Sequence, residues 1–322
     1  MALFCLYYSG LEWLLARLIP VDAAAVLMYH GVCDNAPIPE QINFHVEGAL
    51  FDLQMRLLKR RYRIVPLAEV VAALAHKERL RKCVALTFDD GYKNNALRAA
   101  PILRKYALPS TIFVATAYVS TDNWIPLNEV YWRWVQGELT SDDMARLRKK
   151  LRGLARSKNK ELIEGLSSRR IPDTEAARSS FAMLDWSDIK EMAQAGVEFG
   201  SHTHTHCNMA VEDTDDQLNE LRTSKRLLED HLGVSIQAFA YPYGHAEHMS
   251  ETSRHNIIHA GYDCAISGEY GLVTSEADPF RLPRLGYDRR PWMFTGEICY
   301  QFTRQAVKDA WSRMWRRHSK IS

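Results

Sequence analysis

Short apolar segments alternate with helical patterns over most of the chain, and this alternation is the feature that most constrains the fold. An extended apolar segment followed by an amphipathic helix, repeated along a chain, favours parallel strands with helices packed outside them. The helix predicted at residues 95–106, for example, follows a strand predicted at 83–88. The periodicity alone predicts a parallel α/β protein. The predicted strands lie near residues 24–29, 63–65, 83–88, 110–115, 197–200, 236–241 and 263–267.

The composition fits one globular catalytic domain with additions. The chain has 322 residues, of which 47% are hydrophobic and 25% are charged, as in ordinary globular proteins. A formal net charge of +2 gives no electrostatic reason to expect a nucleic-acid partner. The six cysteines show no Cys-x-x-Cys spacing, which argues against a disulfide scaffold or a thiolate metal site and favours a reducing compartment.

Residues 120–185 interrupt the alternation and predict a helical, Trp-rich insertion. Its aromatic side chains permit two interpretations. We favour a small core of their own, because aromatic residues dominate core burial. The alternative is that they widen a saccharide site, since sugar rings stack on aromatic rings. The aromatic residues concerned are Trp124, Tyr131, Trp132 and Trp134.

The two ends of the chain raise the question of membrane contact. Residues 1–23 predict an amphipathic segment, which contains Glu12 and Arg17 and lacks the basic leading region of a cleaved signal peptide. Residues 291–322 predict a basic helical tail that carries tryptophans such as Trp311. We favour packing of both ends against the catalytic domain. Peripheral contact with the inner face of a membrane is the alternative, so we expect a cytoplasmic or membrane-peripheral location.

Two polar stretches carry the chemistry. Thr-Phe-Asp-Asp-Gly at residues 87–91 and Ser-His-Thr-His-Thr-His at residues 201–206 each end an extended apolar segment. The carboxyl ends of parallel strands meet at one rim, where α/β folds place their active sites. We therefore expect the two stretches to lie together.

The residue types in these stretches predict a metal site with a catalytic base beside it. His202 and His206, at positions i and i+4, can present two imidazole nitrogens to one cation from one face of a helical turn. One carboxylate of the pair Asp89 and Asp90 completes a His-His-Asp set with open positions, as in catalytic zinc sites. The other carboxylate is free to take a proton from a metal-bound water, whose pKa falls toward ~7.

Simpler interpretations exist for each stretch on its own. An Asp-Asp-Gly sequence after a strand often forms only a turn that caps the next helix. A histidine cluster can be a solvated loop, and His204, offset by two from its neighbours, is expected not to be a ligand. The occurrence of both stretches at equivalent places in the strand and helix pattern favours the metal site.

With these motifs in view, residues 24–285 resemble the polysaccharide deacetylase family, the NodB-type chitooligosaccharide deacetylases of carbohydrate esterase family four. The resemblance implies a distorted (β/α)7 barrel at residues 24–290 that contains the insertion. It also implies one divalent ion, with zinc expected first and nickel, cobalt or manganese as alternatives. The partner that it implies is an N-acetylated glycan, such as an exopolysaccharide.

The resemblance assigns roles residue by residue. It implies that Asp89 is the base and that Asp90, His202 and His206 are the metal ligands. Tyr243, in the third motif, is implied to border the substrate groove, with a backbone N–H that helps to hold the oxyanion. That motif reads Ala-Tyr-Pro-Tyr-Gly, which resembles one branch of the family.

Two departures from the family pattern need substitutes. Ala240 stands where the best-known members have an Arg that orients the base, and Arg284 is our candidate to hold Asp89 at the substrate and oxyanion side. The alternative for Arg284 is a plain surface ion pair. The late Leu-x-His motif that supplies a general acid is also missing. We propose that His30, after the first apolar segment, binds substrate or protonates the leaving amine; otherwise it only caps the strand.

The expected activity is metal-dependent removal of an acetyl group from an N-acetylhexosamine unit of a polysaccharide, an oligosaccharide or a lipid-linked glycan. Hydrolysis of another small amide, such as a ureide or a formamide, is an alternative for the same metal arrangement. A degenerate barrel that binds a glycan without cleaving it is a third hypothesis. It is supported by the missing arginine at position 240 and by the missing late histidine.

Overall fold

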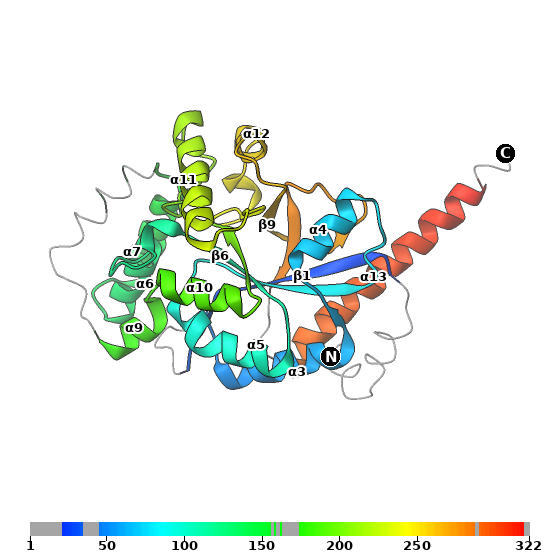
Figure 1. Cartoon of the computed structure of the whole chain (residues 1–322), viewed down its shortest axis with the longest axis horizontal. Helices are drawn as coiled ribbons and strands as arrows, with labels where there is room; N and C mark the ends of the chain where they lie inside the picture. The colour runs from blue at the N-terminus through cyan, green and yellow to red at the C-terminus, as the bar shows by residue number, and fades with distance from the viewer. Residues whose placement is uncertain are drawn as a thin grey trace.

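Seven parallel strands close into a barrel in the computed structural model (Figure 1). The structure describes residues 21–34, 45–155, 158, 162, 174–286 and 290–318. Around the ring the order is β1-β5-β6-β7-β8-β9-β11, and β11 pairs with β1 again. The strands of the ring are β1 (Ala23–Tyr29), β5 (Cys83–Phe88), β6 (Thr111–Val114), β7 (Glu198–Ser201), β8 (Ala238–Ala240), β9 (Cys264–Tyr270) and β11 (Leu282–Gly286).

Four short strands lie outside the ring. β4 (Arg63–Ile64) pairs with β5, and β10 (Val273–Thr274) pairs antiparallel with β1. β2 (Gly31–Val32) and β3 (His45–Val46) form a separate parallel pair. The strand predicted near 63–65 is therefore present as β4 but lies beside the ring, and β11, which the predicted set omitted, closes the ring.

Burial of apolar side chains fixes the register of β1 against β5, which runs from Ala24 opposite Cys83 to Tyr29 opposite Phe88. Both strands are apolar on both faces and almost fully buried, as expected of parallel strands covered on two sides. Burial of each large apolar side chain contributes roughly 1.5–3 kcal/mol. The backbone N–H of Asp89 also donates to the Tyr29 carbonyl over 3.0 Å, so the residues after the two strands emerge side by side.

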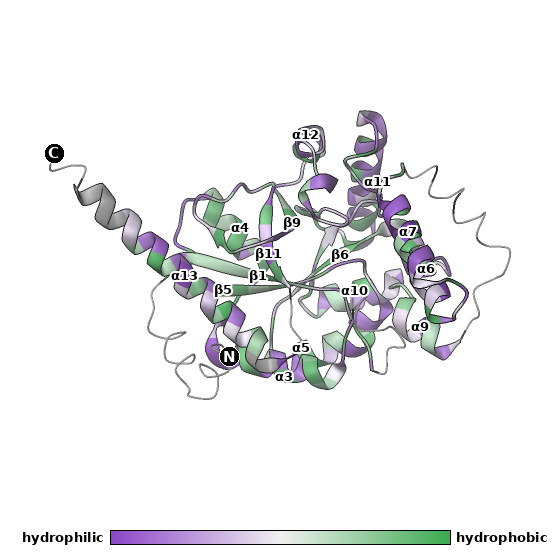
Figure 2. Ribbon diagram, turned by 180° about the vertical axis from the view of Figure 1, so that it is seen from behind, coloured by the Kyte–Doolittle hydropathy of each residue, from purple (hydrophilic) through white to green (hydrophobic). Residues whose placement is uncertain are grey.

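Amphipathic helices surround the ring. In Figure 2, β5 is drawn in the hydrophobic colour, whereas the outward-facing α11 is largely hydrophilic. In α11 (Thr214–Leu232), Leu221 and Leu228 are buried one heptad apart, and Asp213 caps the first turn. The other surrounding helices are α3 (Gly48–Arg61), α4 (Leu67–Ala75), the π-helix η2 (Asn95–Ala99) with α5 (Ala100–Tyr106), α10 (Trp186–Gln194) and α12 (Glu251–His259), and short 3-10 turns lie at η3 (Thr116–Tyr118) and η4 (Ala246–His248).

The insertion contains three described helices between β6 and α10: α6 (Pro126–Val135), α7 (Ser141–Arg152) and α9 (Glu175–Phe181). They gather beside α11 at one end of the molecule (Figure 1). Tyr131, Trp132 and Phe181 are almost fully buried in a cluster of their own, and the ring of Trp124 lies 5.1 Å from that of Phe181. This confirms that the aromatic residues form a small core.

The C-terminal helix α13 (Pro291–His318) packs its first half against α3 and β1. Phe294, Ile298 and Phe302 are buried in the main core, whereas the far end projects from the barrel (Figure 1). Trp311, on the projecting part, is 64% exposed. The amphipathic segment predicted at the N-terminus lies outside the described residues, apart from its last few residues. None of the helices in the described ranges is both long enough and apolar enough to cross a membrane.

Candidate metal centre

All seven site residues predicted from the sequence line one cavity of about 160 Å³ at the carboxyl ends of the strands. They come from five strands. Six of them follow the ends of β1, β5, β7 and β8, and Arg284 lies within β11. The cavity has a volume equal to that of roughly five water molecules. The seven residues are His30, Asp89, Asp90, His202, His206, Tyr243 and Arg284.

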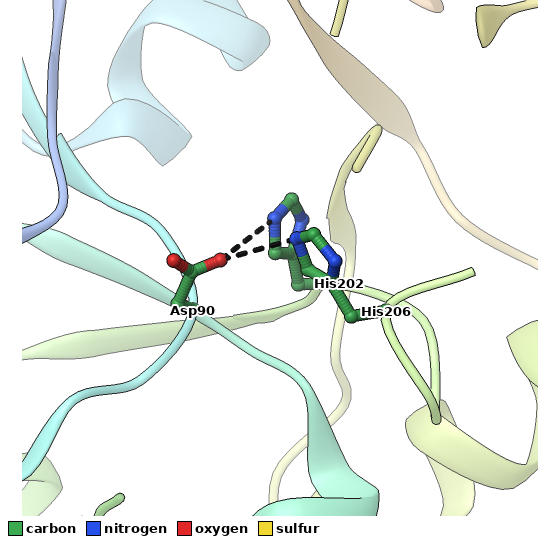
Figure 3. Close-up of side chains that lie close together, drawn as sticks. All are labelled: Asp90, His202 and His206. Carbon is green, nitrogen blue, oxygen red and sulfur yellow. Dashed lines mark ion pairs between the residues drawn. The ribbon is translucent and has the colours of Figure 1, made fainter. Parts of the chain in front are cut away.

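Asp90, His202 and His206 form a buried cluster that fits a metal ion. The Nε2 atoms of His202 and His206 lie 3.5 Å and 3.2 Å from the same oxygen, Oδ1 of Asp90 (Figure 3). One ligand atom from each residue lies within 4.8 Å of the other two. Two imidazole nitrogens and one carboxylate oxygen make the three-ligand set of a catalytic first-row metal site.

The surroundings of the two histidines orient their rings. His202 Nδ1 lies 2.8 Å from the carbonyl oxygen of Ala240, so it carries the proton and leaves Nε2 as the ligand atom. His206 has no such partner among the described residues for its Nδ1, and its ring packs 4.9 Å from that of His202 and 5.0 Å from that of Tyr243. Glu220 of α11 accepts hydrogen bonds from the N–H and the hydroxyl of Thr205, which anchors the loop between the histidines.

Contacts within the cluster shift the pKa values of its members, and they keep Asp90 in the anionic form that binds a metal. Burial raises the pKa of Asp90, but hydrogen bonds from His202 and His206 outweigh burial and hold that pKa well below its usual value. Burial lowers the pKa of His202, yet Asp90 and Asp89 raise it overall. Burial dominates for His206 and lowers its pKa, which favours the neutral form that binds a metal.

The backbone at this site is strained. Asp90, His206 and Tyr243 have φ angles of +77°, +56° and +65°, in the left-handed region that non-glycine residues rarely occupy. Such conformations cost of order 1–3 kcal/mol each and concentrate at functional sites. Thr203, at φ +61°, has the same handedness, so the prediction that the histidines share a helical turn was wrong. They lie on an irregular loop.

Arg284 holds Asp89 by two parallel hydrogen bonds. Its Nη1 and Nη2 donate to Oδ1 and Oδ2 of Asp89, each over 2.7 Å, and its Nε donates to the Ser267 carbonyl over 2.8 Å. The predicted contact between Arg284 and Asp89 is therefore present, and it is buried, unlike the surface ion pair that was its alternative. Burial raises the pKa of Asp89, but Arg284 and His202 outweigh it and the pKa is lowered.

His30 and His204 occupy different environments. His30 lines the catalytic cavity next to Asp89 and Asp90. Burial lowers the pKa of His30 although both carboxylates raise it. His204, expected not to be a ligand, lies outside the metal cluster, and its Nδ1 makes a 2.9 Å hydrogen bond with Thr116 Oγ1.

Among the cavity residues that were not predicted from the sequence are Tyr92, Asn128 and Arg152. The Tyr92 hydroxyl donates to Asn128 Oδ1 over 3.0 Å, and the guanidinium of Arg152 lies 5.4 Å from the ring centroid of Tyr243. Asn128 and Arg152 come from the insertion, and no motif marks them. Only the position of Tyr92, two residues after the metal-ligand aspartate, is a signal in the sequence.

One larger groove lies away from this chemistry. A groove of about 1280 Å³ opens at the amino ends of the strands, where Thr111, Glu198 and Cys264 line it. It contains none of the predicted site residues. We assign the candidate site to the smaller cavity, because it alone combines the metal cluster with the paired Asp89 and Arg284 among the cavities formed by the described residues.

Comparisons with known proteins find deacetylases among the proteins that this chain is similar to. The poly-β-1,6-N-acetyl-D-glucosamine N-deacetylase of Staphylococcus aureus is 22% identical over 76% of this chain and 68% of its own. The structure of the Streptococcus pyogenes deacetylase PplD in complex with acetate has a TM-score of 0.60 and 24% identity, and the match covers 88% of this chain and 99% of that one. The structure of IcaB from Ammonifex degensii has a TM-score of 0.58 and 20% identity, over 86% and 97% of the two chains.

The structural likenesses, at these identities, establish the (β/α)7 fold. The family assignment comes from a model of the polysaccharide deacetylase family, which matches residues 76–265, more than half of the chain. The matched range contains the metal cluster and the third motif. The chain therefore belongs to the polysaccharide deacetylase family.

Proposed function

We propose that this protein is a metal-dependent N-deacetylase that removes the acetyl group from an N-acetylhexosamine unit of a polysaccharide, an oligosaccharide or a lipid-linked glycan. One observation carries the proposal: Asp89, held by Arg284, lines the same cavity as the cluster of Asp90, His202 and His206. A base beside a three-ligand metal set is the arrangement that hydrolyses amides.

We assign the metal cluster to zinc, because two imidazoles and a carboxylate suit zinc best; nickel, cobalt and manganese are the alternatives. A divalent ion bound by Asp90, His202 and His206 would lower the pKa of a water molecule and polarise the acetamide carbonyl. In the neutral imidazole of His202 the hydrogen bond of Nδ1 to the Ala240 carbonyl leaves Nε2 as the ligand atom, which supports this assignment.

Asp89 acts as the general base in this proposal. Its lowered pKa keeps the carboxylate anionic at neutral pH, and Arg284 fixes both of its oxygens in place. The carboxylate then takes a proton from the attacking water. Because Arg284 stabilises the anion, it also makes Asp89 a weaker base, so its main contribution is orientation.

The carbonyl oxygen and the leaving amine need their own partners. The backbone N–H of Tyr243 donates to no acceptor among the described residues, which leaves it available for the oxyanion. His30 is assigned to the leaving-group side, where it binds substrate or protonates the amine. Its lowered pKa reduces the protonated fraction but makes that form a stronger acid.

The S. aureus relative is named for poly-β-1,6-N-acetyl-D-glucosamine, so β-1,6-linked N-acetylglucosamine oligomers are the first substrates to test. The experiment is incubation of metal-loaded protein with β-1,6-linked and β-1,4-linked oligomers, a ureide and a formamide. We expect acetate release and the loss of one acetyl unit by mass spectrometry from a glycan. Turnover of only the ureide or the formamide, or glycan binding without turnover, would refute the proposal.

We also propose peripheral membrane contact through the C-terminal tail, at the cytoplasmic face. The support is a set of exposed apolar residues on one side of α13: Tyr300, Val307 and Trp311. Pelleting with anionic liposomes tests this, and a protein that stays in the supernatant contradicts it.

A further inference from the structure

Two side chains of the insertion line the catalytic cavity beside the metal cluster. Asn128 is in the first turn of α6, and Arg152 is the last residue of α7. Both line the cavity together with Asp90, His206 and Tyr243. The proposed catalytic steps use neither of them.

The side chain of Arg152 has no hydrogen-bond acceptor among the described residues. Its Nε is buried and makes no hydrogen bond to a described residue, and Arg152 forms no ion pair within the described ranges. Its guanidinium lies 5.4 Å from the ring centroid of Tyr243, whose ring lies 5.0 Å from that of His206. Arg152 is half-buried, and a buried N–H of a charged group that lacks a hydrogen bond is costly, so a ligand that supplies acceptor oxygens would stabilise it.

Asn128, which lines the same cavity, carries a second donor without a partner among the described residues. It is only 3% exposed, and its Oδ1 accepts a hydrogen bond from the Tyr92 hydroxyl over 3.0 Å. Its Nδ2 is buried and has no partner among the described residues. Most buried polar groups in proteins are paired, so two such donors in one cavity indicate a ligand that is rich in acceptors.

The end of α7 is anchored to the loop that follows the metal ligands. Asn208 Nδ2 donates to the Arg152 carbonyl over 2.5 Å and lies 2.9 Å from His248 Nδ1. Asn208 comes two residues after the ligand His206 and is almost fully buried. The position of Arg152 is therefore coupled to the metal site, as expected of a preformed binding group.

We propose that Arg152 and Asn128 form a subsite for an anionic group, a carboxylate or a phosphate, carried by the glycan next to the N-acetyl group that is removed. An Arg guanidinium presents paired N–H groups that match carboxylate and phosphate oxygens. A neutral hydroxyl would satisfy one hydrogen bond but leave the positive charge uncompensated. This proposal rests on the proposed deacetylase function and defines its substrate more narrowly.

The test compares three synthetic N-acetylglucosamine oligosaccharides with the same backbone: one neutral, one with a carboxylate and one with a phosphate on the sugar next to the reacting unit. For the wild-type protein we expect kcat/KM to be about 10–100-fold higher with an anionic substrate, the range of a charge-assisted hydrogen bond. The carboxylate and phosphate arms identify which anion is recognised.

Arg152→Gln should reduce that preference to within about 3-fold, mainly through KM, and Asn128→Ala should reduce it in part. Arg146→Gln is the matched control, because Arg146 is on the same helix but exposed and outside the cavity, and it should keep the full preference. Arg152→Lys, which keeps the charge, should retain some preference, and it serves if Arg152→Gln fails to fold.

A wild-type protein that cleaves neutral and anionic substrates equally well would overturn the subsite but leave the deacetylase function intact. An equal loss on both kinds of substrate in Arg152→Gln would also overturn it, because Arg152 would then act only structurally. Release of acetate from none of the three would overturn the proposed function and the subsite with it.

Discussion

Arg284 and Asp89, 195 positions apart in the chain, are joined by two hydrogen bonds of 2.7 Å between buried groups. The guanidinium also reaches Thr87 Oγ1 at 3.3 Å and the Ser267 carbonyl at 2.8 Å. A buried ion pair is stabilising only when its other hydrogen-bonding groups are also paired, and here the five N–H groups of Arg284 make four hydrogen bonds. The geometry of the proposed base therefore depends on a residue of the last strand of the barrel.

Arg284→Met should destabilise the protein and shift its pH dependence. Burial raises the pKa of Asp89 and Arg284 lowers it, so the pKa should rise when Arg284 is removed. The acid limb of the kcat/KM profile should then move to higher pH. Loss of one partner of a buried pair costs about 3–5 kcal/mol at neutral pH. Urea unfolding and pH-rate profiles measure both effects.

The pH dependence of the stability loss distinguishes the loss of the ion pair from a packing defect. In the wild type, the lowered folded-state pKa of Asp89 stabilises the fold above pH ~4, and this is lost as the pH falls through that pKa. In the variant the folded-state pKa is higher, so its deficit relative to the wild type should grow as the pH rises from the wild-type folded-state pKa through that of the variant. Arg281→Met, which breaks the part-exposed pair with Glu269, is the control and should cost at most about 1 kcal/mol.

His202→Gln and His206→Gln should each lose the metal and the activity. Changes to groups that only support metal ligands cost about 10–100-fold in affinity, so loss of a ligand should exceed about 100-fold. Elemental analysis and acetate release measure this. His204→Gln should keep both the metal and the activity, because His204 is hydrogen-bonded to Thr116 although it lies two residues from each ligand in sequence. Equal metal loss in all three variants would mean that the loop, and not the ligand set, determines binding.

Removal of the ion with a chelator should lower the melting temperature as well as the activity. An ion present at 100 times its dissociation constant stabilises the folded state by about 2.7 kcal/mol. Calorimetry before and after re-addition of zinc tests this expectation. Asp90→Asn should abolish the zinc-dependent shift, since Asp90 supplies the only carboxylate of the cluster. An unchanged shift in that variant would contradict the assignment of Asp90.

His30→Gln should reduce turnover by at least ~100-fold while the metal content stays intact, because general acid catalysis contributes about 10²–10⁴-fold. His30 lines the cavity but is not part of the metal cluster. His255→Gln, an exposed change on α12, is the control and should retain wild-type turnover. Near wild-type turnover in His30→Gln would end the proposed role of this histidine.

Gly244→Ala should destabilise the third motif and lower the activity. Gly244 has φ +65°, and an added Cβ would lie 2.4 Å from the backbone nitrogen of Gly268. The backbone must then shift, and Tyr243 with it. Gly233→Ala is the control, because it has φ +70° but open space around the added Cβ. The control should cost about 1–2 kcal/mol of unfolding free energy, and Gly244→Ala clearly more, as measured in urea.

Much of the site could be predicted because strand ends determine it. Apolar strands before Asp90 and His202 imply parallel pairing, and parallel strands bring their carboxyl ends to one rim. Arg284 could be predicted to reach Asp89 because the chain lacked the usual arginine at Ala240. The left-handed backbone at His206 could not be predicted, since positive φ is uncommon in non-glycine residues and the enrichment of His, Asp and Asn there does not mark a particular position.

The insertion shows where prediction from the sequence ends. Its aromatic core followed from composition, but which polar residues turn toward the cavity depends on how α6 and α7 dock on the barrel. Asn128 and Arg152 sit in helices with no motif around them. Likewise Glu220 anchors the histidine loop through a tertiary contact with Thr205.

The order of segments along the chain separates two tasks. The proposed base and the first metal ligand precede the insertion in sequence, and both histidine ligands follow it, whereas Asn128 and Arg152 lie within it. Exchange of the α6–α9 segment between homologous barrels should therefore transfer the preference for an anionic substrate and leave the residues that cleave the amide bond unchanged. The barrel would therefore serve as a constant scaffold, and deacetylases for glycans with different substituents could be engineered by exchange of this one segment.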